Sequence, residues 1–198
     1  MSQQIETQID VTLTERDRMS AFFRIILVVP MAIFVASFTP SDLSTSNSNY
    51  FAVGFLALPA ALAIIFRRIY PSYLLAFNEA LLSLQTRVDA YLLLLTDEYP
   101  SIEENEIVSV DFPPVDAKLL NQWLPLVKWF LAIPLYIVGI FYIIFAFFLT
   151  IFAWFSILFT GNYPEKCAEG VVGTIAYWNR VAGYALLLVT DEYPSFSL

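Results

Sequence analysis

One uninterrupted apolar stretch limits what this chain can fold into. Residues 129–159 hold no charged side chain, and a helix that crosses a bilayer needs about 20 apolar residues. The stretch therefore suits either one long tilted helix or two short helices in a tight hairpin. Two further apolar segments, residues 21–38 and 51–66, carry a single charge between them, Arg24. Together the segments predict an all-α integral membrane protein.

The composition agrees with this class and excludes several others. Hydrophobic residues make up 59% of the 198 residues and charged residues 14%, against about 25% charged residues in a soluble domain. There is no histidine, and the one cysteine, Cys167, cannot form an internal disulfide; histidine-ligated metals and histidine bases are excluded. The net charge of −8 argues against a nucleic-acid partner. Because nucleotide-binding and metalloprotease motifs are missing as well, we expect no enzyme activity and no cofactor.

The chain contains an internal repeat. The hexapeptide TDEYPS occurs at residues 96–101 and again at 190–195. Further matches lie upstream at a spacing of 93 positions: Arg87 with Arg180, Tyr91 with Tyr184, and Tyr70 with Tyr163. Arg24 and Pro30 match Lys128 and Pro134 at a larger spacing, because only the first half has the polar connector at residues 39–50. This pattern predicts a tandem duplication.

The duplication predicts two parallel repeats, each a transmembrane helical hairpin followed by an amphipathic interfacial helix. The first repeat has two separated apolar segments, so the hairpin is favoured for residues 129–159 too, with its turn near residues 140–145. The expected organisation, in chain order, is a cytoplasmic arm at 1–20, a first repeat at 21–101, an acidic cytoplasmic linker at 102–119 and a second repeat at 120–198.

The basic residues indicate an orientation. They lie before, between and after the predicted hairpins, whereas the connector at residues 39–50 has no lysine or arginine. By the positive-inside rule, both termini and the centre of this multi-pass chain face the cytoplasm. Arg24 and Lys128 fall a few residues inside their apolar segments, and their long side chains would reach back to the cytoplasmic interface.

Two amphipathic helices follow the predicted hairpins. Within residues 71–95, apolar side chains recur at alternating spacings of four and three positions, and residues 164–189 repeat the pattern. Such helices either lie in the cytoplasmic interface of the membrane or cover the bases of the hairpins as core helices. Periodicity alone does not distinguish the two arrangements. In the acidic linker, residues 107–112 alternate between apolar and polar and suit a short strand.

The repeated hexapeptide is the candidate interaction motif. Its acids follow a helix C-terminus, where the partial negative charge disfavours them, so we expect a basic side chain nearby. The motif is either a helix stop that fastens the chain at the membrane surface or a docking site for a basic patch. A catalytic carboxylate pair is disfavoured, because no nucleophile or metal cluster accompanies it. The candidate residues are Thr96, Asp97, Glu98, Tyr99, Pro100, Thr190, Asp191, Glu192, Tyr193 and Pro194, with Arg24, Arg67, Arg68 and Lys128 as basic residues of the interface.

The C-terminal half resembles a bacterial family. WLPLVKWFLAIP at 123–134, AWFSILFTGNYP at 153–164 and YALLLVTDEYPSF at 184–196 are similar to the bacterial domain of unknown function 4389 family. The first unit, about residues 15–101, looks like a divergent copy, with Arg-Arg-Ile at 67–69 where the second has Thr-Gly-Asn at 160–162. The resemblance implies a small bacterial inner-membrane protein and supplies no activity and no catalytic residues.

The leading functional hypothesis is a non-enzymatic accessory or structural subunit of a larger inner-membrane complex. The chain has little mass outside the apolar segments, and its Phe- and Leu-rich surfaces suit packing against lipids and other integral membrane subunits, which are the expected partners. The alternative is a lipid-interacting protein that binds or shapes the cytoplasmic leaflet through its amphipathic helices. An oligomeric channel or transporter is less favoured, because only Arg24 and Lys128 approach the membrane interior.

Overall fold

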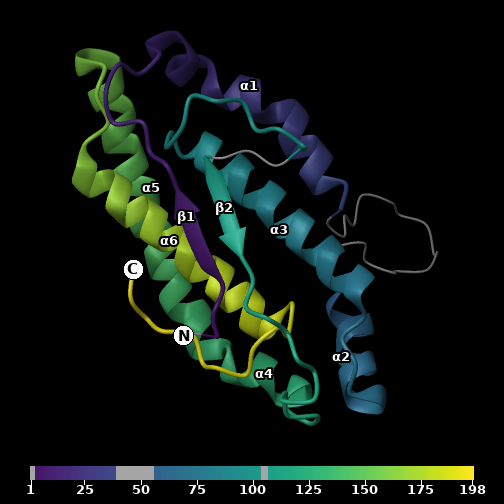
Figure 1. Ribbon diagram of the computed structural model, residues 1–198. Helices are drawn as coiled ribbons and strands as arrows, with labels where there is room; N and C mark the ends of the chain where they lie inside the picture. Colours follow the sequence, from purple (N-terminus) through teal and green to yellow (C-terminus); the bar gives the residue numbers. More distant parts are fainter. Residues whose placement is uncertain (1–2, 39–55, 104–106) are drawn as a thin grey trace, which may run out of the picture.

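The computed structural model describes residues 3–38, 56–103 and 107–198. These residues form three layers (Figure 1). The central layer contains helices α3 (Ser72–Leu92) and α6 (Glu165–Ala185). Helices α1 (Arg18–Ala36) and α5 (Ile133–Thr160) pack on one side of it, and an antiparallel ribbon packs on the other. The ribbon pairs β1 (Glu6–Ile9) with β2 (Val108–Asp111), and the shorter helices are α2 (Ala57–Arg67) and α4 (Pro125–Leu131).

Helix α5 is continuous over 28 residues, so the predicted turn near residues 140–145 is wrong. The physical reason is local, because these positions carry only apolar and aromatic side chains and no turn-forming pair. The one glycine nearby, Gly139, stays helical, and the indole of Trp178 on α6 packs over it. The helix ends at Gly161, whose φ of 77° gives a left-handed cap.

The first half follows the hairpin prediction only in part. Helix α1 covers most of the apolar segment predicted at residues 21–38, and α2 covers the C-terminal portion of the segment predicted at 51–66. The turn between them and the beginning of the second segment lie outside the described residues. Helices α3 and α6 each span 21 residues and follow Pro71 and Pro164.

The apolar stripes of α3 and α6 lie inside the protein, so the expectation that these are interfacial helices is wrong. Leu84, Val88 and Tyr91 of α3 pack against α1, and Tyr177 and Val181 of α6 pack against α5. The reason is that α1 and α5 both present large apolar surfaces. Packing the apolar stripes of α3 and α6 against them removes both surfaces from water. The two helices are therefore core helices, which was the other interpretation of their periodicity.

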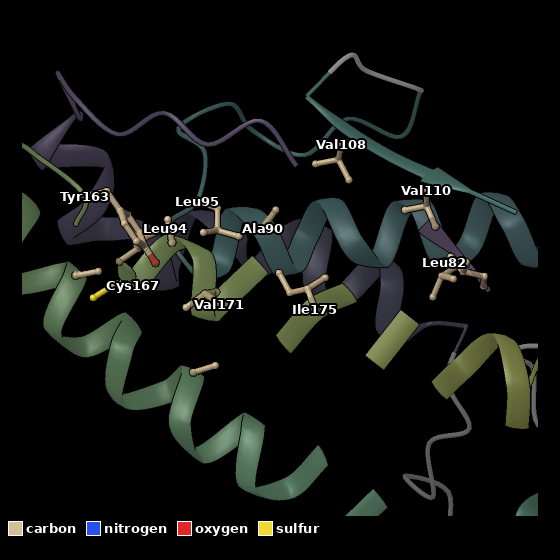
Figure 2. Close-up of a cluster of buried hydrophobic side chains, with 14 of the residues drawn as sticks. Leu82, Ala90, Leu94, Leu95, Val108, Val110, Tyr163, Cys167, Val171 and Ile175 are labelled. Atoms are coloured by element: carbon tan, nitrogen blue, oxygen red, sulfur yellow. The ribbon is translucent and has the colours of Figure 1, made fainter. Parts of the chain in front are cut away.

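The ribbon closes the opposite side of this central layer. Val108 and Val110 of β2 face Leu82 and Ala90 of α3 in one buried cluster (Figure 2). β2 falls within the strand predicted at residues 107–112. A buried polar bridge links three elements: the Asn179 amide donates to the Thr86 hydroxyl at 3.0 Å and to the Thr7 hydroxyl at 2.9 Å. Because both donors of the amide are satisfied, the bridge fixes the register of the ribbon on the helices without leaving an unpaired group.

The layer opposite the ribbon is apolar on its outer surface. Helices α1 and α5 are both long and apolar enough to cross a membrane, and only 22% and 17% of the residues in an 18-residue apolar window of each are buried. Core helices of a soluble protein would be mostly covered. The exposed apolar side chains include Phe22, Ile25 and Ile33 of α1, Phe130 of α4, and Ile140, Phe141, Phe148, Phe152 and Phe159 of α5. We call this surface the apolar side, and it indicates association with a membrane.

Candidate functional site

The hexapeptides form two charged clusters, one after α3 and one after α6. In the first, the Asp97 carboxylate accepts from the Arg24 guanidinium at 2.5 Å and lies 3.1 Å from that of Arg16. It also accepts from the backbone N–H of Asp17, the N-cap of α1, at 3.0 Å. A single carboxylate thus joins the end of α3 to the beginning of α1.

Both arginines also bind the backbone that ends α3. Arg24 donates to the Thr96 carbonyl at 2.7 Å, and Arg16 donates to the carbonyls of Leu94 and Leu95 at 2.6 and 3.0 Å. The Arg24 guanidinium lies 3.9 Å from the centre of the Tyr91 ring. These three carbonyls follow directly after α3, and cations are favoured near the C-terminus of a helix because of its partial negative charge. The arginines therefore offset the acid that the motif places at this end.

The second cluster repeats the first with lysine in place of arginine. The Lys128 ammonium lies 2.8 Å from the Asp191 carboxylate, donates to the Thr190 carbonyl at 2.5 Å and sits 5.0 Å from the centre of the Tyr184 ring. The backbone N–H of Asn121 donates to Asp191 at 2.6 Å, as that of Asp17 does to Asp97. The end of α6 is thus joined to the beginning of α4.

The remaining motif residues also take matching positions. The hydroxyls of Thr96 and Thr190 accept the backbone N–H groups of Glu98 and Glu192, at 3.1 and 3.0 Å. The rings of Tyr99 and Tyr193 pack edge-on against those of Tyr91 and Tyr184, with centroids 5.5 and 5.6 Å apart. Leu94 and Leu188, just before each motif, both have a positive φ. The same sequence therefore forms the same local structure twice.

The two clusters differ in electrostatics. Burial lowers the pKa of Lys128, and the nearby Asp191 opposes this effect. Burial likewise lowers the pKa of Arg16, and Asp97 opposes it. An arginine stays protonated in proteins, whereas a buried lysine can lose its proton. The first cluster thus holds two fixed positive charges around one carboxylate, and the second holds one base that can be neutralised.

The acids of the two clusters are engaged within the protein. Each aspartate is neutralised by a base, and among the residues that the structure describes no group of acids, cysteines or histidines is arranged to hold a metal ion. Glu192 accepts from the backbone of Gln3 at 2.8 Å, so the N-terminal arm covers part of the second motif. Glu98 and Tyr99 are exposed.

Not every predicted basic residue reaches the motifs. Arg68 donates instead to the Gln122 side chain at 3.0 Å, and Arg67 is exposed at the end of α2. Arg16 was not among the predicted candidates, although it is buried and contacts Asp97. At the spacing that relates Arg24 to Lys128, the counterpart of Arg16 is the uncharged Leu120. The repeat therefore did not indicate that Arg16 contacts the motif. The basic charge just before an apolar helix was the one feature that could have suggested it.

The fold defines a helical protein with one apolar side, closed by a polar ribbon and by two clusters at the helix ends. Residues 125–197, from α4 through the second hexapeptide, match the family model described as domain of unknown function (DUF4389). This match confirms the resemblance that the sequence of the C-terminal half indicated. No curated protein and no solved structure matches the chain.

Proposed function

We propose that this chain is a non-enzymatic protein of the bacterial inner membrane that acts as an accessory or structural subunit of a larger membrane assembly. The observation that carries the proposal is the apolar side, because α1 and α5 leave most of their residues uncovered. An apolar surface of this extent requires lipid or another protein to cover it. The charged groups of the two clusters pair with each other within the chain and hold together the helices that present this surface.

The ribbon constrains how the chain sits in the membrane. A two-stranded ribbon has open edges, and open edges do not occur in the hydrocarbon region because their N–H and C=O groups would lack partners. The ribbon packs along α3 and α6, which in turn pack along α1 and α5. We therefore place α1 and α5 in the plane of the cytoplasmic leaflet, with the ribbon facing the cytoplasm.

This placement also suits the charges. Lys128 lies on α4, directly before α5, whereas Lys166 follows α5 and Arg18 lies beside Gly161 at its end. If α5 crossed the membrane, these groups would fall on opposite sides, against the positive-inside rule. In the plane, all of them and both termini stay cytoplasmic. The multi-pass arrangement remains the alternative, and the observation in its favour is that α5 is apolar and 28 residues long.

Labelling of single cysteines distinguishes the two arrangements. In a Cys167→Ala background, we would place one cysteine at Leu119, before α5, and another at Asn162, just after it; both positions are exposed. We expect an impermeant maleimide to label both in inverted membrane vesicles and neither in spheroplasts with an intact inner membrane. Labelling of the two positions from opposite sides would show that α5 crosses the bilayer and would refute the in-plane arrangement.

We also propose that the chain arose by tandem duplication. Support comes from the equal lengths of α3 and α6 and from the matching contacts of Asp97 and Asp191. In the second unit α5 is one helix because the polar connector of the first unit is missing there. Each unit therefore brings one long apolar helix to the same side of the protein.

Photocrosslinking in living cells tests the subunit role. A benzophenone amino acid would replace Phe148, which is 63% exposed on α5, with Asp111 on the ribbon as the control position. We expect the Phe148 position to give a recurrent adduct with one integral membrane protein, identified by mass spectrometry, and the Asp111 position to give none. Protein adducts at neither position would contradict the subunit role.

Lipid adducts alone at Phe148 would favour a second candidate, a protein that binds or shapes the cytoplasmic leaflet. One observation supports it: an apolar groove of about 530 Å³ lies between α1 and α5. Phe22, Ile25, Phe147 and Phe155 line the groove, which suits an acyl chain. In this candidate the lipid contact is made by α1 and α5 rather than by the amphipathic helices α3 and α6.

A further inference from the structure

A cavity of about 370 Å³ lies where α3 and α6 meet α5. Most of its lining comes in pairs of residues that occupy equivalent positions in the two units, 93 positions apart. The pairs are Leu82 with Ile175, Gln85 with Trp178, Asp89 with Ala182, and Leu93 with Leu186. Ile143 and Ala146 of α5 close one side. The cavity thus lies at the junction of the two units.

The two halves of this cavity differ in chemistry. On α3 the paired positions supply the amide of Gln85 and the carboxyl of Asp89, whereas on α6 they supply the indole of Trp178 and the methyl of Ala182. One wall is therefore polar and acidic, and the other is aromatic and apolar. Since equivalent positions carry different groups, the difference is not required by the fold that the two helices share.

Of the described residues that line the cavity, Asp89 alone is charged. Among the described residues, no hydrogen bond or ion pair reaches its side chain. The nearest base along the helix, Arg87, donates to the carbonyl of Ser101 at 2.9 Å. Two of the other polar lining groups are engaged, because Thr174 donates to the Gly170 carbonyl and Asn179 to two hydroxyls. Burial raises the pKa of Asp89 to about 7, as expected for a carboxyl without a counter-charge.

A carboxylate in such a place is stabilised by a cation, and the ring of a tryptophan also attracts cations. Apart from the polar side chains of Gln85, Thr174 and Asn179, the rest of the lining is aliphatic. We propose that this cavity binds an organic ammonium group attached to an apolar body, with the charged nitrogen at Asp89 and the apolar body against Trp178 and the aliphatic wall. The volume suits a small amphiphile or the end of a larger one.

Two sources could supply this chemistry: a free alkylamine, or the ammonium head of a phospholipid such as phosphatidylethanolamine. The site goes beyond the proposed function, because it depends on the contact between α3 and α6 and not on how the apolar side is covered. A failure to bind the ammonium probe would not contradict the subunit proposal. The absence of photocrosslinked adducts at Phe148 would not contradict this site.

Equilibrium binding to the full chain in dodecyl maltoside tests the proposal. The probe is tritiated n-octylamine at pH 8, with n-octanol as the uncharged analogue. The variants are Asp89→Asn, which removes the charge at nearly constant volume, and Glu169→Gln, which removes an exposed charge on α6 as the matched control. Trp178→Leu tests the aromatic wall, and thermal unfolding checks that each variant is folded.

We expect one octylamine bound per chain, at least tenfold weaker binding in Asp89→Asn, weaker binding in Trp178→Leu and unchanged binding in Glu169→Gln. Because Asp89 must be ionised, binding should weaken from pH 8 to pH 5. Equal affinity for octylamine and octanol, or equal octylamine binding in Asp89→Asn and the parent protein, would overturn the proposal. Competition by phosphatidylethanolamine but not by phosphatidylglycerol would identify the lipid head as the source, and competition by neither would identify a free amine.

Discussion

Replacing Asp97 by asparagine is expected to lower the free energy of unfolding by about 3–5 kcal/mol, because it leaves a buried charge without its partner. Arg24 is 2% exposed and Arg16 is 4% exposed, and both depend on this one carboxylate. Neither guanidinium can lose its proton, so both charges would stay in the protein uncompensated. The measurement is thermal or denaturant unfolding of the purified chain in detergent.

The neighbouring acid provides the matched control. Glu98 is exposed and donates only its backbone N–H, to the Thr96 hydroxyl, so Glu98→Gln should change stability by less than about 0.5 kcal/mol. Asp191→Asn should lower the free energy of unfolding by less than Asp97→Asn does, because Lys128 is a single base that can become neutral. Equal effects of Asp97→Asn and Glu98→Gln would contradict the assignment of Asp97 as the centre of the cluster.

Replacing Asp89 by asparagine is expected to stabilise the protein at pH 8 by about 2 kcal/mol. Burial raises the pKa of Asp89 to about 7 in the folded state, above the value near 4 of an unfolded chain. The folded protein therefore holds the proton more tightly, and its stability falls as the pH rises from about 4 to about 7. Water that enters the cavity screens the carboxylate, so the full effect of the shift is not expected.

The pH dependence identifies the cause of this gain. The stability difference between Asp89→Asn and the parent protein should be near zero below about pH 4, grow between about pH 4 and pH 7, and level off above the folded-state pKa of Asp89. Unfolding in detergent at several pH values, with Glu169→Gln as the surface control, measures it. A gain of equal size at all pH values would mean that asparagine packs better than aspartate there, and the carboxyl would then not be destabilised by its burial.

Several features followed from the sequence because their causes are local. The apolar segments gave α1 and α5, since hydrophobicity and helix formation depend on neighbouring residues. The alternation at residues 107–112 predicted β2, and the residues at 123–134, 153–164 and 184–196 predicted the family model that matches residues 125–197. The need for a base near the acids of the hexapeptide followed from helix electrostatics alone.

The features that the sequence did not give depend on contacts between distant residues. β1 formed because β2 offered a pairing edge about a hundred residues away, and short strands have little preference of their own. Which arginines approach Asp97 depended on how α1 lies across the end of α3, so Arg16 was missed, and Arg68 contacts Gln122 instead.

By itself, the sequence determined that this chain has long apolar helices, a repeated hexapeptide that carries acids, and few groups capable of chemistry. Only the tertiary structure decided that residues 133–160 form a single helix, that α3 and α6 are buried, and that one carboxyl, Asp89, faces a cavity between them. The reason is that periodicity specifies which face of a helix is apolar, whereas the surface that covers this face is chosen by all the other elements together.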